Sequence, residues 1–174
     1  TGRTAAGATV VVWATEPVAT AMAKRDGTYE IVGLAPGQVY VAAFTGPYVS
    51  HLRQEDVAPS TIEAQRRNGP CNLALRRGLV VSGTVVDEAT GAGLARARIT
   101  TRLLGERTVL SGADGAYRME GLPAMELKFD IRADGFARTL RGVMPREGDP
   151  NLYHFALEKE GVATVLVTDA EGRP

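Results

Sequence analysis

Several features that would assign a protein class are missing from this 174-residue sequence. It has a single cysteine, which cannot form an internal disulfide. No apolar run approaches the roughly 18 residues needed to span a bilayer, so no membrane insertion is expected. Lysine plus arginine and aspartate plus glutamate each number 20. The resulting zero net charge provides no long-range attraction for nucleic acid, which we do not expect as a partner.

Patterns typical of catalytic and cofactor sites are missing as well. The two histidines, His51 and His154, stand outside any metal-ligand spacing with cysteine or carboxylates. The sequence has no Gly-x-Ser-x-Gly elbow, no phosphate-binding glycine loop and no calcium-binding Asp-x-Asp-x-Asp run. We therefore expect no catalytic residue, no metal and no cofactor, and a protein that is not an enzyme.

The strongest positive signal is an internal repeat. Residues 26–34 reappear as residues 114–122 at an offset of 88, and residues 75–87 reappear as residues 157–169 at an offset of 82. The smaller second offset means that the first copy has six extra residues, between Tyr48 and Leu75. We divide the chain into repeat one (residues 1–78), repeat two (residues 79–160) and the first strand of a further repeat (residues 161–174).

Each repeat has the pattern of a β-sheet protein. Asp-Gly pairs at 26–27 and 114–115 predict a tight turn before each following strand. After the second turn, Tyr117 and Met119 alternate with charged residues, as in a strand with one face on a core and one in water. Short strands between turn signals predict an all-β sandwich for each repeat.

Three segments of repeat two carry a resemblance to a known family. They are Val85-Val-Asp87-Glu-Ala-Thr-Gly91-Ala-Gly-Leu94-Ala-Arg-Ala97-Arg-Ile99, then Asp114-Gly-Ala-Tyr117-Arg-Met-Glu-Gly121-Leu122, then Ala133-Asp-Gly135-Phe136. Together they resemble the carboxypeptidase regulatory-like domain. The resemblance covers nearly all of residues 79–159, is weaker over residues 1–78 and touches one strand in residues 161–174.

The resemblance implies a fold and a class of function. The fold is a prealbumin-like, immunoglobulin-like sandwich of seven strands, related to collagen-adhesin B-type repeats and to carbohydrate-binding-like folds. We therefore expect two tandem seven-stranded sandwiches plus the first strand of a third repeat. Such modules act as non-catalytic spacers or adhesion-type repeats of larger secreted or cell-envelope proteins. The expected partners are neighbouring repeats of the parent protein, with a protein or a glycan as the alternative ligand.

Aligning the two repeats at the offset of 88 predicts an apolar sheet face on repeat one. Its members stand where repeat two has outward-facing polar and charged residues; they are Val10, Val12, Tyr40 and Phe44, joined by Tyr48. An apolar patch of this kind usually marks a contact. Either residues 49–72 cover it, or it packs against a neighbouring repeat or domain, or it binds glycans with Trp13 added as a stacking ring. The alignment turns Trp13 inward, which argues against the third alternative.

The two ends of the chain suggest strand exchange. The family's first strand, residues 80–86 in repeat two, has no counterpart before repeat one, and its copy lies at residues 162–168 instead. A sandwich without this strand exposes unpaired backbone groups. One hypothesis is that residues 162–168 of one molecule pair with repeat one of another, head to tail. The alternative is that this strand packs locally or extends freely.

A basic stripe is the last candidate site. Arg96, Arg98 and Arg102 recur at alternate positions of one predicted strand. Such a stripe is a solvated face or domain contact more often than an anion site. No aromatic residues are interleaved with these arginines to stack on bases, so the stripe does not indicate nucleic-acid binding.

Overall fold

A computed structural model describes residues 5–14, 17–51, 56–64, 71–102, 106–164, 166 and 169. Over these residues the regular elements are all β-strands, which confirms the all-β prediction. In this part of the chain there is no helix that is long and apolar enough to cross a membrane.

Repeat one contains a single sheet of six strands. They are β1 (Thr9–Trp13), β2 (Pro17–Met22), β3 (Gly37–Thr45), β4 (Tyr48–Val49), β5 (Pro59–Ile62) and β6 (Arg76–Arg77). The order is β2-β1-β3-β4-β6, and β5 pairs with the first part of β3, beyond β4. All the pairs are antiparallel.

Repeat two contains two sheets. Its strands are β7 (Leu79–Asp87), β8 (Arg98–Thr101), β9 (Arg107–Leu110), β10 (Ala116–Leu122), β11 (Leu127–Arg132), β12 (Thr139–Val143) and β13 (Phe155–Leu157). One sheet has the order β10-β7-β13 and the other β12-β11-β8-β9. β7 is the central strand of the first sheet, antiparallel to β10 and parallel to β13.

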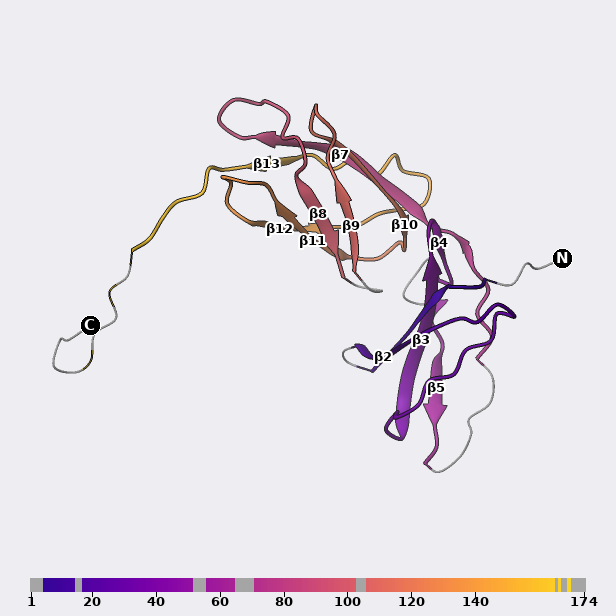
Figure 1. The fold of residues 1–174 in the computed structure, drawn as a ribbon. Helices are drawn as coiled ribbons and strands as arrows, with labels where there is room; N and C mark the ends of the chain where they lie inside the picture. Colours follow the sequence, from indigo (N-terminus) through magenta and orange to yellow (C-terminus); the bar gives the residue numbers. More distant parts are fainter. Residues whose placement is uncertain are drawn as a thin grey trace.

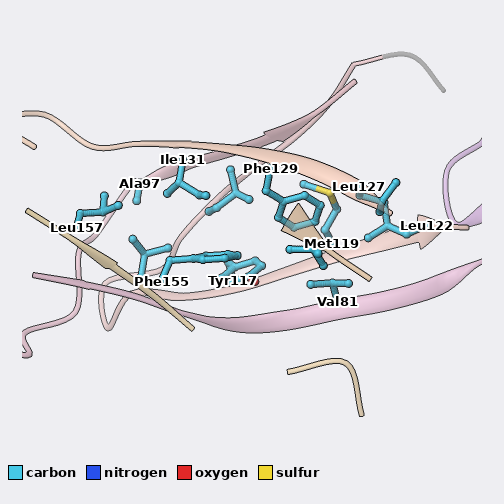
Figure 2. Packing of buried hydrophobic residues seen from close by; sticks show 13 residues of the cluster. Val81, Ala97, Tyr117, Met119, Leu122, Leu127, Phe129, Ile131, Phe155 and Leu157 are labelled. Atoms are coloured by element: carbon cyan, nitrogen blue, oxygen red, sulfur yellow. The ribbon is translucent and has the colours of Figure 1, made fainter. Parts of the chain in front are cut away.

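The core of repeat two lies between these sheets. Alternate residues of each strand point inward, so Met119, Phe129 and Ile131 are buried while Arg118 and Lys128 are exposed. Figure 2 shows Met119, Phe129 and Ile131 packed together with the other core residues, which are Tyr117, Phe155 and Leu157. Full burial of an aliphatic or aromatic side chain contributes about 1.5–3 kcal/mol. The alternation read from the sequence therefore accounts for the stability of this repeat.

Repeat one differs from the predicted seven-stranded sandwich. Within the described residues its second layer consists of residues 28–36 and 71–75, which lie in no strand. No described strand lies between these two segments, whereas in repeat two β7 pairs with both β10 and β13. Residues 161–164, 166 and 169 also lie in no strand, and the rest of the predicted strand 162–168 lies outside the described residues.

Candidate functional site

The predicted apolar surface of repeat one is divided between the two faces of its sheet. Val10 and Val12 are each only 2% exposed and belong to the core, so the prediction that they face outward is wrong. In repeat two Arg132 pairs with Arg98, but its counterpart Phe44 pairs with Thr9 instead of Val10. The alignment of the repeats is therefore off by one residue in β1. Because side chains alternate along a strand, this slip moves every β1 side chain to the opposite face.

Tyr40 and Phe44 do share a face, and Trp13 joins them; we call these three residues the aromatic face. Trp13 pairs with Tyr40 across β1 and β3, and their rings stack with centroids 5.9 Å apart. The inward orientation predicted for Trp13 is wrong for the same reason as above. Tyr48, which is 46% exposed, pairs with Thr45 and not with Phe44, so the register turns it to the other face.

Cover of the aromatic face by residues 49–72 stays a prediction; Val11 and Ala42, which share this face, are each 2% exposed. β5 extends the sheet alongside β3 instead of crossing it. Ile62 and Cys71 pack against the core cluster on the face opposite Phe44. Phe44 also meets repeat two, because the Arg107 guanidinium lies over its ring, 4.8 Å from the centroid.

Arg107 is the principal side chain of the junction between the repeats. Its Nη1 donates to the carbonyl oxygens of Gly46 in repeat one (2.8 Å) and Glu120 in repeat two (3.1 Å). Nη2 is buried and has no hydrogen-bond partner within the described part of the chain. Burial lowers the pKa of Arg107, although an arginine remains charged at any physiological pH. No sequence pattern marked this residue.

Glycines allow the backbones of the two repeats to approach closely. Gly78 alone separates β6 from β7, and its N–H donates to the Pro47 carbonyl at 2.9 Å. Gly121 has a φ of +70° and lies at a register shift in β10. A Cβ there would lie 2.6 Å from the Gly46 carbonyl oxygen and 2.7 Å from Arg107 Nη1. β4 and β10 therefore pack together at the meeting point of the repeats (Figure 1).

A cleft of about 1680 Å³ lies on the core face of repeat one. Its walls are residues 28–34 on one side and residues 71–75 on the other; residues of β1 and β3 and residues 60–64 also line it. The walls correspond to β10 and β13 of repeat two. We call this feature the repeat-one cleft.

The wall residues of the repeat-one cleft are less buried than their counterparts in repeat two. In repeat two the inward residues of β10 and β13 are at most 5% exposed; they are Tyr117, Met119, Leu122, Phe155 and Leu157. Their counterparts in repeat one are only half-buried; they are Tyr29, Ile31, Leu34, Leu73 and Leu75. Between the walls of repeat two stand Val81 and Val85 of β7, each 0% exposed. No described strand occupies that place in repeat one.

The predicted basic stripe is exposed but not continuous. Arg96 has a φ of +59° and lies in the turn before β8, so it does not share the alternation of the strand. Arg102 pairs with Glu106 at 3.2 Å. Arg98 stands beside Arg132, which already pairs with Asp130. An anion site at this stripe stays a prediction.

Asp130 organises the charged face of repeat two. Only 7% exposed, its carboxylate accepts two hydrogen bonds from Arg132 and two from Arg138, at 2.9–3.0 Å. These hydrogen bonds, Arg132's first, hold the pKa of Asp130 well below its usual range. Asp130 therefore neutralises one of the two arginine charges beside it.

The reactive residues named in the sequence occupy structural positions. His51 Nδ1 lies 2.7 Å from Ser50 Oγ, which accepts the Ala43 N–H, and burial lowers the pKa of His51. His154 Nδ1 lies 2.9 Å from Thr84 Oγ1. Cys71 is a free, half-buried thiol in a wall of the repeat-one cleft. Among the residues that the structure describes, no three His, Cys, Asp or Glu side chains gather closely enough to hold a metal ion.

The core, the Asp-Gly turn and the two-sheet order of repeat two agree with one family. Residues 80–158 match the model of the carboxypeptidase regulatory-like domain. Repeat two is thus similar to a carboxypeptidase regulatory-like domain over these residues. No curated protein matches the chain.

Among solved structures, similarity is low in sequence and partial in shape. The Streptococcal ancillary pilin is 14% identical with a TM-score of 0.37, over 89% of this chain and 57% of the pilin. The Bacillus anthracis TIE protein is 18% identical with a TM-score of 0.38, over 90% of this chain and 32% of that protein. A mutant of shaft pilin spaA from Lactobacillus rhamnosus GG is 10% identical with a TM-score of 0.37, over 91% of this chain and 95% of the pilin chain. The chain thus spans less than two thirds of the first two proteins.

Proposed function

We propose that this chain is a non-catalytic structural and interaction module, a pair of stiffly joined repeats that serves as a spacer or adhesion-type segment of a larger secreted or cell-envelope protein. The repeats are residues 1–78 and 79–160, and residues 161–174 begin a further one. Its partners are neighbouring repeats and, through strand exchange, other copies. The exported location rests on the carboxypeptidase regulatory-like domain, a family common in such proteins.

The junction is the observation that carries this proposal. Flexible linkers are rich in glycine and serine and exposed to water. Here one glycine separates β6 from β7, and it is buried and hydrogen-bonded to Pro47. Arg107 adds hydrogen bonds to both repeats. The Arg77–Glu120 pair, at 3.8 Å and largely exposed, adds little. A fixed angle between repeats is the property that a spacer needs.

Single-molecule energy transfer tests the fixed angle at a dilution where copies do not associate. Dyes are attached at Thr61→Cys in repeat one and Lys128→Cys in repeat two, both exposed positions, in a Cys71→Ser background. We expect one narrow transfer population. A control with a Gly-Ser linker inserted after Gly78 gives the distribution of a flexible pair. An unmodified junction that matches this control would contradict the proposal.

Glycan binding is the second candidate, favoured by the stacked pair of Trp13 and Tyr40. It has less support, because Phe44 lies under Arg107 and Tyr48 faces away, leaving two rings that already contact each other. A glycan array separates the two candidates. Binding that disappears in Trp13→Ala would favour the glycan alternative.

A further inference from the structure

The outer face of the four-stranded sheet of repeat two carries a row of arginines. The register places Arg98 of β8 between Arg132 of β11 and Leu110 of β9. Arg138, which immediately precedes β12, lies on the other side of Arg132. Because neighbouring strands are about 4.7–4.9 Å apart, three cationic side chains follow one another at close spacing across the sheet. We call Arg98, Arg132 and Arg138 the arginine row.

One carboxylate orients two members of the arginine row. Asp130 Oδ1 accepts hydrogen bonds from the Nε groups of Arg132 and Arg138, both at 3.0 Å, and Oδ2 accepts from their Nη2 groups, both at 2.9 Å. A carboxylate has about four lone-pair sites, so these bonds use all of them. The Nη1 groups of both arginines make no hydrogen bond with a described residue. The two guanidiniums are therefore held in place with donors left over, which lowers the entropy lost when a ligand binds.

The arginine row is exposed and carries an excess of positive charge. The side chains of Arg132 and Arg138 are 53% and 52% exposed, and Arg98 is exposed as well. Arg98 makes no ion pair with a described residue, so three arginine charges stand beside the one carboxylate of Asp130. The whole chain has no net charge, so this excess is local. Planar guanidiniums bind carboxylates through two parallel hydrogen bonds, and a carboxylate is therefore the ligand that the row favours.

Apolar side chains beside the arginine row favour a protein as the partner. Leu110 of β9 is 50% exposed and Leu140 of β12 is 57% exposed. Both lie on the same face as the row, because Leu110 pairs with Arg98 and Leu140 pairs with Asp130. Protein interfaces are enriched in arginine and bury apolar side chains at their centre. Nucleic-acid bases stack on aromatic rings, and none of the side chains named on this face is aromatic.

We propose that the arginine row binds an acidic segment of a partner protein, whose carboxylates pair with Arg98 and Arg132 and whose apolar side chains cover Leu110 and Leu140. Arg107 and Leu110 are three positions apart in β9, so their side chains point to opposite faces of the sheet. The row is therefore separate from the junction, and it adds a binding role to the proposed spacer role.

Selection from a library of random peptides tests the chemistry of the partner. Displayed peptides are selected on the immobilised full-length chain, and the Arg98→Ala variant is used for counter-selection. We expect the enriched peptides to be rich in aspartate and glutamate and to carry apolar residues beside them. Enriched peptides without an acidic bias, or no enrichment over the counter-selection, would overturn the inference.

Substitutions of Arg98 separate a carboxylate site from a general attraction of charge. Arg98 is exposed and has no ion pair with a described residue, so its variants leave the fold intact, which urea unfolding checks. By fluorescence anisotropy with an enriched peptide, we expect Arg98→Ala to weaken binding about tenfold. Arg98→Lys keeps the charge but loses the planar fork, and should weaken binding at least about threefold. Arg146→Ala removes the same charge from the exposed loop before β13 and is the matched control, with an effect below about twofold.

Two results of these measurements would assign a different ligand. If Arg98→Lys binds the peptide as tightly as the unmodified chain, the row attracts charge without recognising carboxylates. If a heparin fragment binds more tightly than every enriched peptide, the ligand is a sulfated polyanion and not a protein. Either result overturns the inference. The arginine row lies within one repeat and the energy-transfer experiment uses no peptide, so a failure of binding is distinguishable from a failure of the fixed junction.

Discussion

Tyr117 donates its phenolic hydrogen to the backbone carbonyl of Tyr153 at 2.9 Å, and the same bond recurs in repeat one between Tyr29 and the Cys71 carbonyl at 2.8 Å. The partners are 36 residues apart in repeat two and 42 apart in repeat one. The difference of six equals the difference between the two sequence offsets. The bond therefore fixes the equivalence of Cys71 and Tyr153, although the repeats differ in their second layers.

Removing this hydroxyl tests how much the bond contributes in each repeat. We expect Tyr117→Phe to lower the free energy of unfolding by about 1–2 kcal/mol, because it leaves the half-buried Tyr153 carbonyl without its donor. Tyr29→Phe should cost less, since Tyr29 is only half-buried. Urea unfolding followed by circular dichroism measures both. Equal losses would contradict the difference in burial.

The same tyrosines predict a loss of stability in alkali. Burial raises the pKa of Tyr29 to about 12, from about 10 in the unfolded chain. Above pH 10 the unfolded tyrosine ionises while the folded one does not, so its contribution is present below pH 10 and is lost as the pH rises toward 12. Tyr29→Phe should therefore lose less stability than the unmodified chain over this interval. If the free energy of unfolding falls equally in the two proteins between about pH 10 and 12, the raised pKa of Tyr29 is not its cause.

Glycine at the junction offers a comparison between equivalent positions. Gly121 and Gly33 have φ values of +70° and +76°, so alanine is strained at both, by about 1–2 kcal/mol. Only at Gly121 would the new Cβ also meet another backbone; at Gly33 nothing lies within 4 Å. We expect Gly121→Ala to cost more than Gly33→Ala and to broaden the energy-transfer distribution between the repeats. Gly33→Ala should leave that distribution narrow.

Arg107 should matter more than any other charged side chain at the junction. Arg107→Ala removes two charge-assisted hydrogen bonds and the contact with Phe44, and we expect a loss of about 2–3 kcal/mol. In calorimetry the repeats of this variant should unfold at more widely separated temperatures. Arg102→Ala is the matched control, because Arg102 is exposed and pairs with Glu106, four residues away. A control that destabilises equally would argue against a special role for Arg107.

The buried carboxylate of Asp130 makes a prediction in acid. Asp130→Asn should cost about 1–3 kcal/mol at neutral pH, because the hydrogen bonds from Arg132 and Arg138 lose their charged acceptor. The pKa of Asp130 is lowered in the folded state, so its contribution is present above the unfolded value of about 3.9 and is lost as the pH falls below it. The difference in free energy of unfolding between Asp130→Asn and the unmodified chain should therefore shrink as the pH falls through that range. Asp134→Asn, at an exposed position, is the matched control, and an equal loss at neutral pH would contradict the role of Asp130.

The repeat, its offsets and the alternation in repeat two could all be predicted from the sequence, because they depend on local spacing. Tyr117 and Met119 alternate with charged residues, and the structure buries both. The aromatic face could not be predicted correctly. A shift of one residue in β1 leaves the composition of the strand unchanged but reverses the faces of Val10 and Trp13, and only pairing with β3 fixes that register.

Pattern along the sequence was enough to predict an all-β chain with an internal repeat, and a second copy that resembles the carboxypeptidase regulatory-like domain. These are properties of pattern and order along the chain. Only the tertiary structure decided the rest: a cleft between residues 28–34 and 71–75 with no described strand between them, and a junction closed by Arg107 and Gly121. Both depend on contacts between residues far apart in sequence, and local propensity does not encode such contacts.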